Sequence, residues 1–252
     1  MIFLQLKTTG VFTARQLKNQ IMKYWIFSLL VFVSVSSFAQ ADAAQDSIPF
    51  EIRKQAYLYS MANKYNDPSV ARMALYNLLV ADPTNTAILD SLAISYFDYQ
   101  QYASAALVAQ DAIAINPKDL FATEIAAIAF ENLGVKSRSI TYYEKLYLAN
   151  NSLSTLYKIC FLQLDEKRYN EGLNNADVII NSSKSETLKL VFPVNQKETQ
   201  EVSMKVAAIR FKGMLEEDRG NTSMALEYYQ KAIEMEPEFV ILKEQIKTLK
   251  GE

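Results

Sequence analysis

Residues 86–119 read TAILDSLAISYFDYQQYASAALVAQDAIAINPKD, and the asparagine–proline pair Asn116–Pro117 lies close to their end. An aspartate–proline pair, Asp82–Pro83, lies 34 residues earlier. Proline fixes its own φ and disfavours α geometry in the residue before it, so each pair marks the end of one helix and the turn into the next. The spacing therefore indicates a helical unit of about 34 residues that recurs along the chain.

The composition favours helices and excludes several kinds of active site. Half of the 252 residues are apolar, enough for a sizeable core, and only six glycines and six prolines interrupt the chain. The chain has no histidine and a single cysteine, Cys160. Catalytic triads, histidine-based zinc sites and an internal disulfide are therefore excluded, whereas chemistry based on carboxylates or lysine is not.

Aligning the chain on its proline pairs shows that small and aromatic residues recur at the same places. In 86–119, the eighth, eleventh, twentieth and twenty-fourth places hold Ala93, Tyr96, Ala105 and Ala109. In 120–153, the eighth, eleventh and twenty-fourth places hold Ala127, Phe130 and Tyr143, and in 206–239 the eighth, twentieth and twenty-fourth places hold Gly213, Ala225 and Tyr229. This pattern resembles the tetratricopeptide repeat family. The resemblance implies an all-α, right-handed superhelical solenoid of about five helix–turn–helix repeats, at 52–85, 86–119, 120–153, 153–186 and 206–239.

Small residues at the eighth and twentieth places have a packing role, because two helices approach closely only where small side chains meet. Two such pairs are expected, Ala93 with Ala105 and Gly213 with Ala225. Cys160 falls at the eighth place of its repeat. We therefore interpret it as a packed thiol and not as a nucleophile.

Two glycines lie where the paired helices of a repeat should be joined. Gly134 and Gly220 suit the left-handed turn that ends a helix. Asn221 follows Gly220, and its side chain is expected to cap the next helix.

The N-terminal region has the features of an export signal. Residues 24–35, YWIFSLLVFVSV, form an apolar run after Lys23, and small residues at Ser37 and Ala39 match the pattern that signal peptidase requires. The run is shorter than the roughly 20 residues that span a bilayer. We therefore predict a signal peptide at 22–39 that is cleaved after Ala39, with an uncleaved anchor as the alternative.

The segment from Met22 resembles secretory signals of Bacteroidetes-type bacteria. Residues 1–21 are then an over-extended start, although Met1 remains an alternative first residue. Residues 40–50 are small and polar and are expected to be a flexible leader. The predicted location of the remaining chain, residues 51–252, is the periplasm or the medium.

The helical period stops between the fourth and fifth repeats. Residues 187–204 alternate between apolar and polar side chains and predict a β-hairpin insertion. A long loop packed on neighbouring helices is the alternative, and an exposed strand edge could contact a partner. Residues 238–250 are amphipathic and are expected to cap the solenoid.

One face of the first helix in each repeat is expected to line a partner-binding groove. Residues at the second, fifth, ninth and twelfth places share this face by helical geometry. The candidate partner-binding residues on it are Asp90, Ile94, Phe97, Phe121, Glu124, Ile128, Tyr157, Phe161 and Arg210. An apolar centre with carboxylates beside it favours an apolar or basic–apolar peptide. The alternative is that the aromatic members form the core between repeats.

The resemblance implies a protein–protein interaction scaffold or assembly factor in the bacterial periplasm. Its partner is expected to be a protein or peptide, and no catalytic residue, metal or cofactor is expected. The net charge is −2, and the first 39 residues hold four basic and no acidic residues, so the remainder is acidic and does not attract nucleic acid. The alternatives are a structural subunit of an envelope complex and a carboxylate-dependent hydrolase that uses Asp90 and Glu124. Contact with the membrane is expected only through an uncleaved signal segment.

Overall fold

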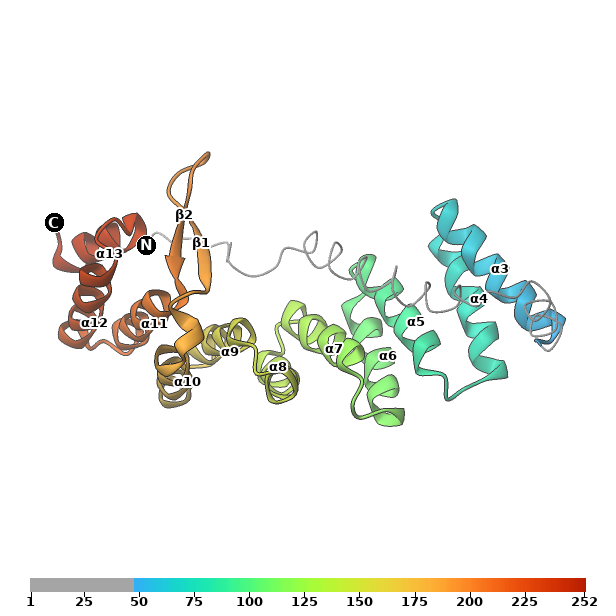
Figure 1. Ribbon diagram of the computed structural model, residues 1–252. Helices are drawn as coiled ribbons and strands as arrows, with labels where there is room; N and C mark the ends of the chain where they lie inside the picture. Colours follow the sequence, from blue (N-terminus) through green and yellow to red (C-terminus); the bar gives the residue numbers. More distant parts are fainter. Residues whose placement is uncertain (1–47) are drawn as a thin grey trace. The chain divides into compact units, whose positions relative to one another are not determined.

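The computed structural model describes residues 48–252, and within this range the chain forms eleven α-helices, one 3₁₀ helix and one two-stranded sheet (Figure 1). The predicted early start, the signal peptide and most of the leader lie outside the described residues. The described chain divides into two compact units, which meet in sequence at Asn150 and Asn151. We refer to residues 48–150 as the N-terminal unit and to residues 151–252 as the C-terminal unit.

The N-terminal unit consists of three helix pairs that pack in chain order. These pairs are α3 (Phe50–Lys64) with α4 (Pro68–Ala81), α5 (Thr86–Asp98) with α6 (Tyr102–Ile115), and α7 (Leu120–Asn132) with α8 (Lys136–Asn150). Asp67, Asn85 and Asp119 each accept a backbone N–H bond at the start of the following helix. These caps satisfy amide groups that have no partner inside the helix.

The C-terminal unit consists of two helix pairs, a hairpin and a final helix. These are α9 (Leu153–Asp165) with α10 (Tyr169–Asn181), the 3₁₀ helix η1 (Ser183–Ser185), β1 (Lys189–Pro193), β2 (Thr199–Ser203), α11 (Met204–Asp218) with α12 (Thr222–Met235), and α13 (Val240–Lys250). Helix α10 packs on α11, and α13 packs on α12. The prediction of an all-α repeat fold made of consecutive helix pairs is therefore confirmed.

The predicted β-hairpin is also confirmed. Strands β1 and β2 are antiparallel, with Leu190 opposite Val202 and Phe192 opposite Gln200. Val202 is fully buried and Phe192 is half-buried, and both belong to a cluster with Phe239 just before α13. The apolar face of the hairpin thus packs inside the C-terminal unit, as the alternative loop interpretation also expected for this segment.

Close contacts at small residues hold the helix pairs together. Ala93 and Ala105 are both completely buried, as expected for a small pair. Gly213 on α11 is buried against Tyr229 on α12, so that a Cβ atom at Gly213 would lie 2.3 Å from Tyr229 Cε1. The tyrosine ring occupies the space that a side chain at residue 213 would need.

The turns inside the helix pairs confirm one prediction made from the sequence and contradict another. Gly134 and Gly220 adopt positive φ angles of 73° and 87°, which confirms the predicted left-handed turns. Asn221 was wrongly expected to cap α12, because its side chain makes no capping bond there. Its Nδ2 donates instead to Glu216 Oε2 at 2.6 Å, since the buried carboxylate of Glu216 needs a donor.

Gly213→Ala tests the close contact between α11 and α12. The new methyl group would clash with the Tyr229 ring, so we expect the free energy of unfolding to fall by about 2 kcal/mol, as in other overpacked cores. Gly172→Ala is the matched control, because its Cβ would meet the flexible end of Leu215 at 3.2 Å and Phe211 Cε1 at an ordinary contact distance of 3.7 Å. Urea denaturation of both variants would measure the difference, and equal stabilities would contradict the proposed role of Gly213.

Candidate functional site

The nine candidate residues lie on four helices and in both units. Asp90, Ile94 and Phe97 lie on α5, Phe121, Glu124 and Ile128 on α7, Tyr157 and Phe161 on α9, and Arg210 on α11. The structure therefore brings the first six together in the N-terminal unit and the last three together in the C-terminal unit.

Two apolar candidates on α5 form part of the core. Ile94 and Phe97 are each only 9% exposed. The Phe97 ring makes an edge contact with Tyr102 of α6, with the ring centroids 5.4 Å apart. Their assignment to an exposed groove was therefore wrong, because both side chains are buried and Phe97 packs against the paired helix α6.

The two aromatic candidates on α9 pack inside the C-terminal unit. The ring centroid of Phe161 lies 4.8 Å from that of Phe211 on α11 and 5.1 Å from that of Tyr157. Burial raises the pKa of the Tyr157 hydroxyl above its ordinary value. These contacts support the alternative interpretation, in which the aromatic residues form the core between repeats.

Arg210 joins α11 to α13 and the hairpin. It is only 6% exposed, and its Nε donates to Gln245 Oε1 at 2.9 Å. Its guanidinium carbon lies 5.8 Å from the ring centroids of both Phe192 and Phe239. Arg210 was therefore wrongly placed among the partner-binding residues, because its charge is used within the unit.

Asp90 is the candidate with the most unusual electrostatic environment. Its Oδ1 atom is buried and has no hydrogen-bond partner. Burial raises the pKa of Asp90 to about 7, and Asp119 contributes to this rise through charge repulsion and a side-chain hydrogen bond. The proximity of Asp119 to Asp90 was not predicted, because the sequence pattern around Asp119 indicates only an aspartate that caps a helix.

Three candidates on α7 lie on one face of that helix and are half-buried. Burial raises the pKa of Glu124, which has no hydrogen bond or ion pair. Phe121 and Ile128 are the apolar neighbours at i−3 and i+4. We call Asp90, Phe121, Glu124 and Ile128 the carboxylate face of the N-terminal unit.

Cys160 has the environment of a structural thiol. It is fully buried, and its Sγ contacts the carbonyl oxygen of Gly172 at 3.9 Å. Burial raises the pKa of the thiol, which disfavours the reactive thiolate. The interpretation of Cys160 as a packed residue therefore fits its position in α9.

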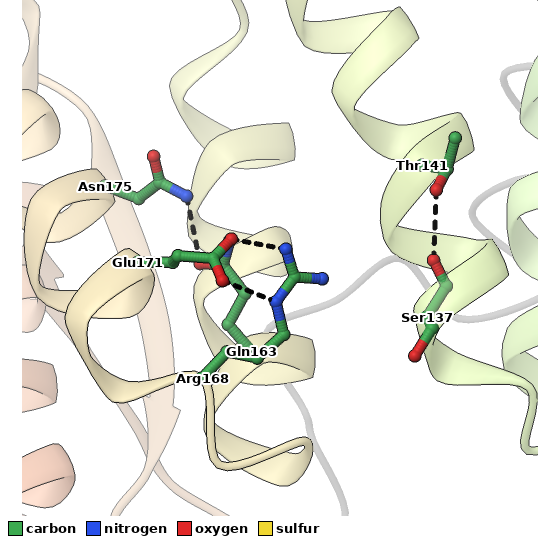
Figure 2. A network of polar contacts seen from close by, with 6 residues as sticks. All are labelled: Ser137, Thr141, Gln163, Arg168, Glu171 and Asn175. Carbon is green, nitrogen blue, oxygen red and sulfur yellow. Dashed lines mark hydrogen bonds and ion pairs between the residues drawn. The ribbon is translucent and has the colours of Figure 1, made fainter.

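An open depression lies at the turns of the C-terminal unit, and the side chains that line it are held in place by contacts within the unit. Its lining consists of Lys167, Arg168, Tyr169, Asn170, Glu171 and Arg219. Arg168 forms an ion pair with Glu171, and the buried Gln163 accepts a bond from Asn175 nearby (Figure 2). Arg219 donates to Asn170 at 2.9 Å. These charged groups stabilise the turns.

Residues 48–252 contain neither a cluster of metal ligands nor a helix suited to span a membrane. In this part of the chain, no group of three or more histidine, cysteine, aspartate or glutamate side chains is arranged to hold a metal ion. None of the helices described there combines the length and the apolar character that a membrane span requires.

Solved structures with a similar arrangement of helices share little sequence with this chain. A tetratricopeptide repeat protein from Parabacteroides merdae is 20% identical, with a TM-score of 0.55 over 80% of this chain and 73% of its own. YrrB, described as a tetratricopeptide repeat protein with an unusual peptide-binding site, is 13% identical, with a TM-score of 0.56 over 85% of this chain and 100% of its own. MamA from Desulfovibrio magneticus is 11% identical, with a TM-score of 0.53 over 77% and 99% of the two chains.

The fold is that of the tetratricopeptide repeat. Identities this low establish the fold alone. No family model matches the sequence, and no curated protein matches it either. The repeat assignment therefore rests on the helix pairs of the structure and on these structural neighbours.

Asp90→Asn tests the electrostatics of the carboxylate face. The folded chain keeps the Asp90 proton up to about pH 7, so between the ordinary carboxyl pKa and pH 7 its stability falls as pH rises. The variant should raise the free energy of unfolding at pH 8 by about 1 kcal/mol, which is less than the full shift because water partly screens the group. At pH 4 the gain should be small.

Urea denaturation at the two pH values measures this effect, with Asp111→Asn on the exposed surface of α6 as the control. An equal effect of Asp90→Asn at pH 4 and pH 8 would show that ionisation of Asp90 is not disfavoured by folding.

Arg210→Met tests the internal role of Arg210. The variant keeps an apolar stem but loses the bond to Gln245 and the charge beside two aromatic rings, so we expect a loss of stability of about 2 kcal/mol. Lys205→Met, at a half-buried lysine paired with Glu186, is the control and should change stability by less than about 1 kcal/mol. Thermal unfolding would distinguish the two, and an unchanged midpoint for Arg210→Met would refute the internal role.

Proposed function

We propose that this chain is a protein-interaction scaffold that holds a segment of a partner protein against the carboxylate face. The observation that carries the proposal is the state of Asp90 and Glu124. Both carboxyl groups are half-buried, and neither forms an ion pair. A surface with this property favours a ligand that supplies positive charge.

The physical argument concerns the cost of removing a carboxylate from water. Desolvation without an opposite charge is unfavourable, and the raised pKa values of Asp90 and Glu124 express this cost, to which the interaction with Asp119 adds at Asp90. A lysine or arginine side chain placed beside either carboxylate would offset it. Phe121 and Ile128 lie on the same helix face and offer apolar contacts beside the charge. The expected ligand is therefore a basic segment with apolar side chains.

The peptide-binding site named in the description of YrrB supports a peptide or protein ligand for this fold. We further propose that the scaffold acts in the bacterial periplasm. The apolar run at 24–35 and the small residues at Ser37 and Ala39 support export of the chain. In this account the chain itself catalyses no reaction.

Affinity capture from envelope extracts, followed by mass spectrometry, tests the proposal. The bait is the full chain, compared with the double variant Asp90→Asn with Glu124→Gln. The control double variant is Asp111→Asn with Glu227→Gln, which removes two exposed carboxylates elsewhere. We expect a protein that the wild type and the control capture equally and that the test variant captures at least about tenfold less.

The segment of the captured protein that contacts α5 or α7 should be basic and apolar, and raising the salt concentration should weaken its binding. Equal capture by all three baits, or turnover of a substrate by the isolated chain, would contradict the proposal. A complex of fixed stoichiometry that persists at high salt would instead favour a structural subunit of an envelope assembly.

A further inference from the structure

A second surface of the N-terminal unit lies on the outer face of α3. Phe50, Tyr57 and Tyr65 are 67%, 69% and 68% exposed, and Met61 is 38% exposed. At 100° per residue, these four side chains fall within about 80° of one another around the helix axis. We call them the α3 stripe. Exposed apolar side chains that are grouped in this way commonly mark a surface that binds another protein.

The repeat itself shows what this face normally does. Tyr65 occupies the place that Tyr99 occupies 34 residues later, at the end of α5. The Tyr99 hydroxyl donates to Asn66 Oδ1 at 3.2 Å, and its ring centroid lies 5.6 Å from the Arg72 guanidinium carbon on α4. This side of a first helix therefore packs against the preceding repeat. No repeat precedes α3 within residues 48–252.

The stripe is not, however, the surface of an ordinary internal repeat. The places of Tyr57 and Met61 are occupied on α5 by Ser91 and Ser95, which are half-buried. Large side chains on α3 would not fit the close packing that those serines permit. The stripe thus differs from the regular stacking surface, and a ligand of the stripe must leave room for these side chains.

The charges around the stripe define the chemistry of that ligand. Lys54 and Lys64 project on the same side of α3, within about 40° of Phe50 around the helix axis. The acidic residue of α3 is Glu51, which is paired with Lys54 at 3.4 Å. A partner helix with carboxylates beside its apolar residues is complementary to this border.

A second copy of the chain fits less well. Two α3 stripes facing each other would bring like-charged lysines together. Helix α13 ends the C-terminal unit, and its exposed side chains are polar and mainly basic: Lys243, Glu244, Lys247, Thr248 and Lys250. We propose that the α3 stripe binds an amphipathic helix of another protein, whose apolar residues are bordered by aspartate or glutamate.

Two synthetic peptides test this inference without knowledge of the natural partner. Each is a helical peptide of about 20 residues with one leucine stripe, bordered by glutamate in the first peptide and by lysine in the second. Fluorescence anisotropy with the full chain should show that the glutamate peptide binds at least about tenfold more tightly, and that salt weakens its binding.

The variant Tyr57→Ser with Met61→Ser gives α3 the residues that α5 carries at these places, and we expect about tenfold weaker binding of the glutamate peptide. Val80→Ser is the control, because Val80 is 82% exposed on α4 and lies outside the stripe. All three substitutions are at partly or largely exposed positions, so unfolding midpoints should stay close to that of the wild type.

Equal affinities for the two peptides, no binding of either, or unchanged binding by the serine variant would overturn the inference. A dimer in light scattering that the serine variant converts to a monomer would also overturn it, since the occupant would then be a second copy. The lysine peptide resembles the ligand proposed for the carboxylate face, so both peptides are also measured with the full chain that carries Asp90→Asn and Glu124→Gln. The preference for the glutamate peptide should persist in this variant, which makes the result independent of the proposed function.

Discussion

The close approach of paired helices at small residues is the constraint on which the rest of the chain depends. Gly213 has no space for a side chain because the Tyr229 ring lies where a Cβ would be, and Ala93 and Ala105 are completely buried. This approach determines which faces of each helix are buried against the paired helix. The carboxylate face and the α3 stripe consist of side chains that this packing leaves outside the helix pairs.

The repeat could be predicted from the sequence because its constraints are local and recur. Proline after a polar residue ends a helix, and small residues recur where helices meet, so the fold class was predicted correctly. The hairpin was predicted from another local pattern, the alternation of apolar and polar side chains at 187–204. The alignment also locates equivalent contacts. Tyr143 donates to Glu131, and Tyr229 to Glu217, across the same twelve-residue interval in two repeats.

The candidate site was less predictable, because burial depends on partners from other elements. Helical spacing placed Ile94, Phe97 and Arg210 on the same face as Asp90, but a spacing rule cannot show which residues a neighbouring helix covers. Arg210 is engaged by Gln245 of α13, which lies outside the repeats and has no place in their alignment. The α3 stripe was missed for a related reason, since aromatic residues on a first helix are ordinarily core.

The N-terminal unit combines two surfaces of opposite electrical character. The carboxylate face has acidic groups that are partly removed from water, whereas the α3 stripe has lysines at its border. Different ligands are therefore expected at the two surfaces. Binding of one protein at each surface would agree with the proposed role of a scaffold.

The most direct test of the central claim, that a partner protein binds the carboxylate face, is hydrogen–deuterium exchange of the full chain with and without the partner recovered from envelope extracts. The account predicts that the partner slows amide exchange in α5 and α7, at residues 86–98 and 120–132, because the ligand covers this face. Protection confined to α9–α13, or no protection in the N-terminal unit, would contradict the account.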